Sequence, residues 1–203
     1  MNESLKILEW VAAFLSLWCV WLAAKNRIIN WPVSMLASIL YANIFYNNRF
    51  YSESFLQAIF FAFQSFGWWY WSSLNPKKTS QLIRKTPTKT AKYLLYCFFL
   101  GYLLWYTIYT YLFKDARFPL IDVFLTVLSI TALYMQAKRW IEHWYLWIIA
   151  DIIYVPMFYF GDQKITSGLY LIFIGLAFYG LKQWKKEKAD LHNRPCIFII
   201  HKM

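Results

Sequence analysis

The chain has 203 residues, of which 60% are hydrophobic, 23% are aromatic and only 15% are charged. Soluble domains are about 45–50% apolar and about 25% charged, so this composition excludes an ordinary soluble domain and indicates a polytopic membrane protein. The net charge of +11 does not predict a nucleic-acid partner, because the basic residues of membrane proteins collect in cytoplasmic loops. The three cysteines and three histidines are too scattered for a disulfide framework or a metal site, and no cofactor is expected.

Seven apolar runs are long enough to cross a bilayer as helices, which takes about 20 mostly apolar residues. Because backbone groups cannot stay unpaired in lipid, each run is expected to be a helix. In chain order, the spans are predicted at residues 7–24, 28–47, 53–73, 92–113, 119–137, 140–160 and 165–184. The predicted fold class is therefore an all-α polytopic membrane protein with seven transmembrane helices.

The first three and the last three spans repeat one sequence pattern at a constant offset of 113 residues. Matching pairs include Lys25 and Lys138, Trp31 and Trp144, Ala37 and Ala150, Tyr41 and Tyr154, Gly67 and Gly180, and Trp71 and Trp184. Each copy has an odd number of spans, so the single span between the copies lets both run in the same direction. The expected architecture is a parallel three-plus-one-plus-three repeat, with the substrate site between the halves near the middle of the bilayer.

The spans divide the chain into five predicted segments. These are residues 7–73 as the first three-helix repeat, 74–91 as a basic cytoplasmic linker, 92–113 as a connecting transmembrane helix, 119–184 as the second three-helix repeat, and 185–203 as a cytoplasmic tail. Sixteen of the 21 lysines and arginines fall on the side of the linker and the tail. This asymmetry predicts that the N-terminus is outside and the C-terminus is cytoplasmic.

The sixth span carries an aromatic face around one carboxylate. Trp144, Trp147, Asp151 and Tyr154 are three or four residues apart and so share one side of a helix. A carboxylate near mid-membrane costs about 2.5–3.5 kcal/mol on insertion scales, so it is kept inside a bundle, either as a structural hydrogen-bond partner or, by default, for function. Aromatic faces attract a flat cation, and the carboxylate neutralises it or accepts hydroxyl hydrogen bonds. The pattern therefore predicts a planar cationic heterocycle as the ligand.

The matching face of the second span is polar but has no carboxylate. It carries Trp31, Ser38 and Tyr41, and Asn43 adds a further polar group. Ser38 stands where the sixth span has Asp151. The scaffold is thus symmetric while its chemistry is not, which predicts an asymmetric ligand with one charged or hydroxyl-rich end.

Gln57 and Gln64 are seven residues apart and share one face of the third span. Amides in such a place either read ligand hydroxyls or a carboxamide, or bridge neighbouring helices, and both interpretations remain open. The sequence has no phosphate-binding GxxxxGK[ST] loop, and its central carboxylate has no histidine or serine partner, so an ATPase or an intramembrane hydrolase is poorly supported. A membrane sensor that binds a ligand without moving it is a second hypothesis, against which the internal repeat argues.

Several motifs resemble the PnuC family of bacterial vitamin transporters over about residues 7–187. They are Asn30-Trp31-Pro32-Val33, Phe45-Tyr46, Arg49-Phe50-Tyr51, Leu56-Gln57, Gly67-Trp68-Trp69-Tyr70-Trp71, Phe118-Pro119 with Asp122, Lys138-Arg139-Trp140-Ile141-Glu142, and Trp144-x-x-Trp147-x-x-x-Asp151. The resemblance implies a fold akin to a full-length SWEET-type sugar transporter, with substrate bound between the halves. It also implies Trp144, Trp147, Asp151 and Gln57 as the leading contacts and Gln64 as a weaker one.

The resemblance further implies a facilitator of the bacterial inner membrane. Its substrate would be a small cationic vitamin or nucleoside that moves downhill by alternating access and is trapped by phosphorylation in the cytosol. The Asn-Trp-Pro entry to the second span favours nicotinamide riboside, an NAD precursor. Thiamine has the same flat cationic ring and hydroxyls and remains the alternative, while neutral riboflavin makes less use of Asp151. Small residues such as Ala37 and Gly175 permit close helix contact within or between chains, so a homo-oligomer remains open.

Overall fold

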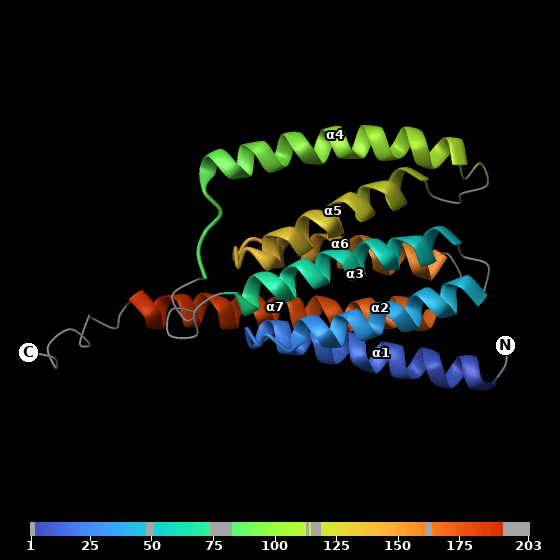
Figure 1. The fold of residues 1–203 in the computed structure, drawn as a ribbon, viewed down its shortest axis with the longest axis horizontal. Helices are drawn as coiled ribbons and strands as arrows, with labels where there is room; N and C mark the ends of the chain where they lie inside the picture. Colours follow the sequence, from blue (N-terminus) through green and yellow to red (C-terminus); the bar gives the residue numbers. More distant parts are fainter. Residues whose placement is uncertain are drawn as a thin grey trace, which may run out of the picture.

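The computed structural model describes residues 3–47, 51–73, 83–112, 114, 119–160 and 164–192, and these ranges contain seven helices (Figure 1). The helices are α1 (Glu3–Ala24), α2 (Asn30–Asn47), α3 (Tyr51–Ser72), α4 (Thr88–Leu112), α5 (Pro119–Ala137), α6 (His143–Phe160) and α7 (Lys164–His192). The predicted all-α polytopic fold is confirmed. Figure 1 also shows α1 and α5 running toward the same end of the bundle, which is the end where α4 begins and α7 finishes. This is called the linker end below.

Two helices extend beyond the predicted spans. The predicted tail from residue 185 begins as helix, since α7 continues to His192, because residues 185–190 are mostly strong helix formers even though they are too polar for a span. The linker was expected to extend to residue 91, but α4 begins at Thr88, where the carbonyl of Pro87 accepts the amide of Ala91 at 2.9 Å. The remainder of the tail, 193–203, and most of the linker, 74–82, lie outside the described residues.

The first helix of each predicted repeat ends in the same unusual turn. Asn26 after α1 and Arg139 after α5 both have left-handed backbones, with φ of 53° and 56°. In each turn the amide of the following residue bonds back, at 3.0 Å, to a carbonyl of the helix five residues earlier, as in a Schellman cap. Residues other than glycine rarely adopt this backbone conformation. Its recurrence at an offset of 113 residues therefore supports the predicted repeat.

Tryptophans connect the two halves at the linker end. The indole of Trp71 on α3 donates to the carbonyl of Ala137 on α5 at 2.8 Å, and the indole of Trp184 on α7 donates to Ala23 on α1 at 2.9 Å. The last carbonyls of a helix lack partners within that helix. Each tryptophan therefore donates a hydrogen bond to such a carbonyl in the opposite half. In accordance with these bonds, α3 packs on α5 and α1 packs on α7.

Two buried tryptophans lie against glycines at equivalent places. Trp31 on α2 packs on Gly67 of α3, and Trp144 on α6 packs on Gly180 of α7. A Cβ atom at either glycine would lie 2.5 Å from the indole ring, closer than atoms approach one another. Each glycine therefore lets two helices close around a ring, and this explains why both recur in the repeat.

The connecting helix α4 stands at the side of the bundle. Among the described helices it packs only on α5, and Tyr109 is its one buried residue. By length and mean hydropathy, α4 and α5 are the described helices apolar enough to cross a membrane, whereas tryptophan, tyrosine and polar residues lower the hydropathy of the others. The large apolar side chains exposed on α4, including Leu100, Leu103 and Leu104, suit contact with lipid.

Candidate substrate-binding site

Asp151 lies in the interior of the bundle on α6. Its residue is only 5% exposed, while Ile149 and Ile152 on either side are about half exposed and face outward. Among the described residues, none donates a hydrogen bond to its carboxylate. A buried ionised group is costly unless it is paired. The site therefore contains an acceptor of hydrogen bonds or positive charge to which none of the described residues donates.

Aromatic residues from both halves surround this carboxylate. Tyr154 follows Asp151 on α6, and its ring centroid lies 4.6 Å from that of Tyr170 on α7. The Tyr154 hydroxyl hydrogen-bonds with Ser129 of α5. Asp151 and Tyr41 of α2 are both electrostatic neighbours of the Tyr170 hydroxyl. Four helices, α2, α5, α6 and α7, therefore place side chains around one point.

The rings form a continuous wall next to the carboxylate. Phe158 stacks on Tyr154, with ring centroids 5.5 Å apart and ring planes 14° apart. It also stacks on Tyr170, with centroids 5.2 Å apart and planes 25° apart. The electron-rich faces of such rings attract cations. Together with Asp151, this wall has the chemistry to hold a flat, positively charged ring. Tyr170 occupies the position that Gln57 has in the first half, at the repeat offset of 113 residues, and this equivalence is the sequence signal that places it on the same face.

A chain of polar side chains lies one turn away from Asp151, toward the linker end. The indole of Trp147 on α6 donates to Gln136 of α5 at 3.3 Å, and the amide of Gln136 donates to Asn30 of α2, also at 3.3 Å. Asn30 in turn donates to the carbonyl of Arg27 at 2.6 Å. This chain joins the two halves. Sequence reasoning missed Gln136, although a lone glutamine in an apolar span is itself a signal for a buried polar contact.

Ser38 and Gln64 bond to each other. The serine hydroxyl lies 3.2 Å from Oε1 of Gln64, and Nε2 of Gln64 lies 3.1 Å from the hydroxyl. Both side chains are buried. Of the two open interpretations for Gln64, bridging between helices is the one that this conformation adopts. The equivalent positions in the second half are Asp151 and Ala177, and an alanine offers the carboxylate no hydrogen bond.

Trp31 and Trp144 lie in the core, with exposures of 1% and 2%. Sequence reasoning placed them on the ligand-facing surface. Their rings instead pack on glycines. The centroid of the Trp144 ring also lies 4.6 Å from that of His143 and 5.9 Å from that of Trp184. In this conformation the two tryptophans are buried behind the site and pack against its helices. Helical spacing predicts which residues share a side of the helix, but it does not predict how deeply the rings are covered by a neighbouring helix.

Comparisons with known proteins identify the family. The sequence model of the nicotinamide mononucleotide transporter family matches residues 6–186. The chain belongs to this family. The nicotinamide riboside transporter PnuC of Escherichia coli K12 is 26% identical over 92% of this chain and 88% of that protein, and the match to its Shigella flexneri counterpart has the same values.

Two further relatives help to define the fold and its variants. A crystal structure of the vitamin B3 transporter PnuC matches 90% of this chain and 82% of that one, with a TM-score of 0.69 and 20% identity. The riboflavin/roseoflavin transporter RibM of Streptomyces davaonensis is 28% identical, but over only 39% of this chain. The fold is therefore that of a membrane transporter, and the similarity to PnuC extends over most of the chain.

Two of the predicted contacts, Asn43 and Gln57, are less buried than Asp151. Asn43 is exposed and accepts a hydrogen bond from Asn47 at 3.0 Å. Gln57 is half-buried on α3, two turns from Gln64. The structure thus gathers Asp151, Tyr154 and Tyr41 into one cluster and places Trp147 next to it. It leaves Asn43 at the surface.

Proposed function

We propose that this chain is a facilitator that carries nicotinamide riboside, a precursor of NAD, across the bacterial inner membrane. One observation supports this most strongly: the Asp151 carboxylate is buried without a hydrogen-bond donor among the described residues, beside the rings of Tyr154 and Tyr170, which lie 4.6 Å apart and both stack on Phe158. Nicotinamide riboside supplies what this site lacks. It has a flat cationic ring for the aromatic wall and ribose hydroxyls that donate to a carboxylate.

The polar chain beside Asp151 suits the rest of such a substrate. Nicotinamide riboside also carries a carboxamide, which needs both a donor and an acceptor. Gln136 and Asn30 are amides, and Trp147 is a half-buried donor next to them. A substrate that reached these groups would exchange hydrogen bonds with the existing chain, and it would contact both halves of the protein at once.

The halves suit alternating access by rocking. Each half contacts the other through α3 on α5 and α1 on α7, while the central connection α4 packs on α5 alone among the described helices. Relatives of this chain are named as transporters, and we infer transport rather than catalysis here. The chain has no ATP-binding loop, so downhill movement with phosphorylation in the cytosol would provide the direction. In this proposal the linker end faces the cytoplasm and the N-terminus lies outside.

Thiamine is the alternative substrate, because it too combines a flat cationic ring with a hydroxyl. Full-length similarity to nicotinamide riboside transporters favours the first substrate. The riboflavin transporter matches only part of the chain, and a neutral ring would leave Asp151 without a counter-charge.

The test is calorimetric titration of the purified protein with nicotinamide riboside, thiamine and riboflavin, followed by uptake of the tightest ligand into proteoliposomes. We expect nicotinamide riboside to bind most tightly and to accumulate only to the external concentration unless a kinase and ATP are enclosed. Selective binding of thiamine would change the substrate but keep the site. Binding without flux would instead support the sensor hypothesis.

A further inference from the structure

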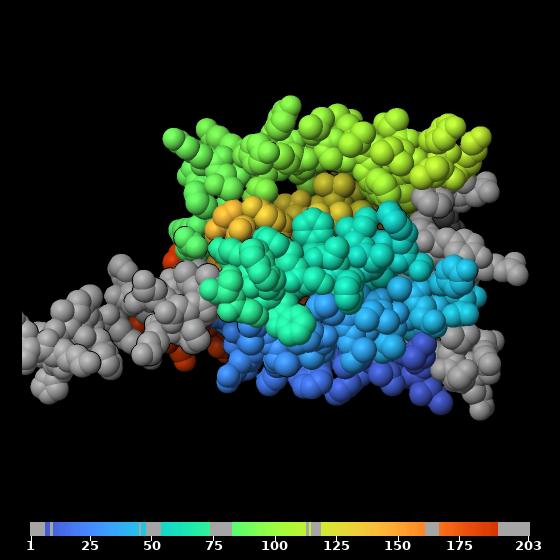
Figure 2. All heavy atoms as spheres, in the orientation of Figure 1, coloured from blue at the N-terminus to red at the C-terminus, as the bar shows by residue number. Residues whose placement is uncertain are grey.

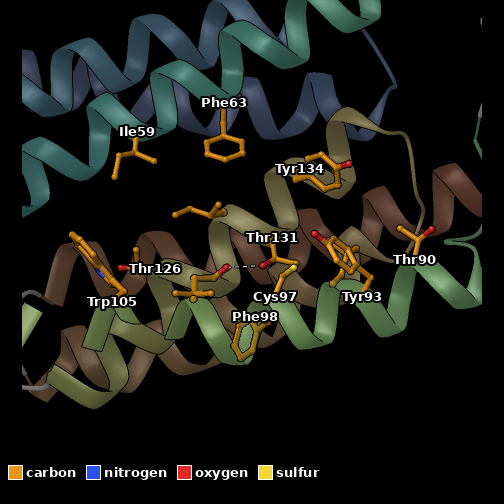
Figure 3. A pocket seen from close by; sticks show the side chains of 14 residues that line it. Ile59, Phe63, Thr90, Tyr93, Cys97, Phe98, Trp105, Thr126, Thr131 and Tyr134 are labelled. Carbon is orange, nitrogen blue, oxygen red and sulfur yellow. Dashed lines mark hydrogen bonds between the residues drawn. The ribbon is translucent and has the colours of Figure 1, made fainter. Parts of the chain in front are cut away.

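A cavity lies between α3, α4 and α5, away from the proposed substrate site. It has a volume of about 470 Å³ and opens sideways between α3 and α4. Figure 2 shows the hollow between α4 and α3, and Figure 3 shows the side chains around it. None of the residues that surround Asp151 lines this cavity.

The cavity exists because α4 packs on α5 but makes no packing contact with α3 in the described parts of the chain. Ile59 and Phe63 of α3 form one wall, and Val127 and Ile130 of α5 form its floor. Gly101 on α4 has no side chain to fill the space. The fold spans a membrane, so the mouth of this crevice meets lipid chains and not water.

The two ends of the crevice differ in polarity. Figure 3 shows Thr90, Tyr93 and Tyr134 together at one end, which is the linker end, and Ile59, Trp105 and Thr126 at the other, so three hydroxyl groups gather at the linker end against one at the opposite end. Hydroxyl groups of this kind occur where a membrane protein meets the headgroup region. The crevice therefore has an apolar depth and a polar end, like a lipid molecule.

Positive charge lies beside the polar end. The ammonium of Lys138 is 4.1 Å from the ring of Tyr70 and 5.8 Å from the ring of Tyr134, which lines the crevice. Lys89 is exposed in the first turn of α4, next to Thr90. These charges favour an anionic headgroup over a neutral one, since each basic residue near a membrane surface attracts anionic lipid.

We propose that this crevice binds one acyl chain of an anionic phospholipid, with the headgroup phosphate at Lys89 and Lys138. A helix from a second copy fits less well, because this chain has a net charge of +11 and the polar end of the crevice already has lysines beside it. The lipid chain joins α4 to α3, which otherwise do not pack together. The proposal is independent of the transported substrate.

The first experiment is native mass spectrometry of the detergent-purified protein with phosphatidylglycerol or phosphatidylcholine of identical acyl chains. We expect phosphatidylglycerol to bind at least fivefold more tightly. Each substitution, Lys89→Gln or Lys138→Gln, should weaken it about fivefold, which corresponds to the roughly 1 kcal/mol that a basic residue contributes at an anionic surface. Lys186→Gln, at an exposed position on α7, is the control and should leave binding unchanged. Equal binding of the two lipids would overturn the headgroup assignment.

The crevice itself is tested by filling it. A Cβ at Gly101 would meet only Val127, at an ordinary 3.8 Å, so Gly101→Leu projects into the space and should reduce phosphatidylglycerol binding tenfold or more. Leu103→Phe adds bulk on the exposed side of α4 and should have no effect. If Gly101→Leu does not fold, Ile59→Phe fills the same space from α3. Unchanged lipid binding in a folded variant, or a change in oligomer mass instead, would refute the proposed lipid.

Discussion

The two halves of the protein place different chemistry at equivalent positions of a similar scaffold. In the first half, Ser38 and Gln64 bond to each other across α2 and α3 and are buried together. In the second half, the corresponding residues are Asp151 and Ala177, and none of the described residues donates to the carboxylate. One half thus satisfies its own polar groups, whereas the other keeps a strong acceptor free for a ligand. We propose that binding specificity comes from this difference.

The largest effect is expected from removing the carboxylate. Asp151→Ala should reduce nicotinamide riboside uptake about 30-fold or more, because losing one partner of a buried charged interaction costs about 2–5 kcal/mol. Ser38→Ala, at the equivalent position, should change uptake only a few-fold. Initial rates in proteoliposomes, with monodispersity as a check of folding, make the measurement. Equal losses in the two variants would show that the halves contribute alike and would remove the proposed asymmetry.

The chemical difference between the halves can also be removed by making the second half resemble the first. Ala177→Gln places an amide where the first half has Gln64, so that it donates to Asp151. A hydrogen bond to a charged group contributes about 1.5–3 kcal/mol, and we expect substrate affinity to fall roughly tenfold or more. Titration calorimetry would measure this loss. Ala177→Leu is the matched control, because it adds similar bulk without a donor, and an equal loss there would mean that size alone obstructs the site.

The two glycines test the part of the scaffold that the halves share. A Cβ at Gly67 or Gly180 would overlap the ring of Trp31 or Trp144. Overpacking of a core costs about 1–3 kcal/mol, so both Gly→Ala variants should lower thermal stability by similar amounts. Gly175→Ala has open space around its Cβ and serves as the control. Destabilisation at one glycine alone would mean that only one half depends on this packing.

Local patterns in the sequence were sufficient to predict the helices and much of the symmetry. Apolar runs placed all seven helices, and the recurrence of Trp31 and Gly67 as Trp144 and Gly180 pointed to equivalent helix contacts. The helix α7 continues beyond the predicted span, which ends at residue 184, since hydropathy falls at Lys185 while helix propensity does not. Hydropathy detects the membrane boundary, and a helix can continue beyond it.

The details of the site depend on distances that a sequence pattern does not contain. Gln136 and Asn30 are 106 residues apart, and the repeat does not mark them as a pair, because their counterparts at the offset of 113 are Ala23 and His143. The face of Trp144 followed from helical spacing, but its burial depends on Gly180 of another helix. Asp151 could be predicted as a site residue because a carboxylate within a membrane span is rare and is by default a candidate for function.

The smallest effect is expected from the polar chain that joins the halves. Trp147→Phe keeps an aromatic ring but removes the donor to Gln136, and a neutral hydrogen bond contributes about 0.5–1.5 kcal/mol, so uptake should fall by a few-fold. Gln136→Leu removes both of its bonds, to Trp147 and to Asn30, and leaves two buried groups without partners. It should therefore have the larger effect of the two. If the double variant lost no more than Gln136→Leu alone, Trp147 would act through Gln136, whereas additive losses would show that its indole contributes to binding independently.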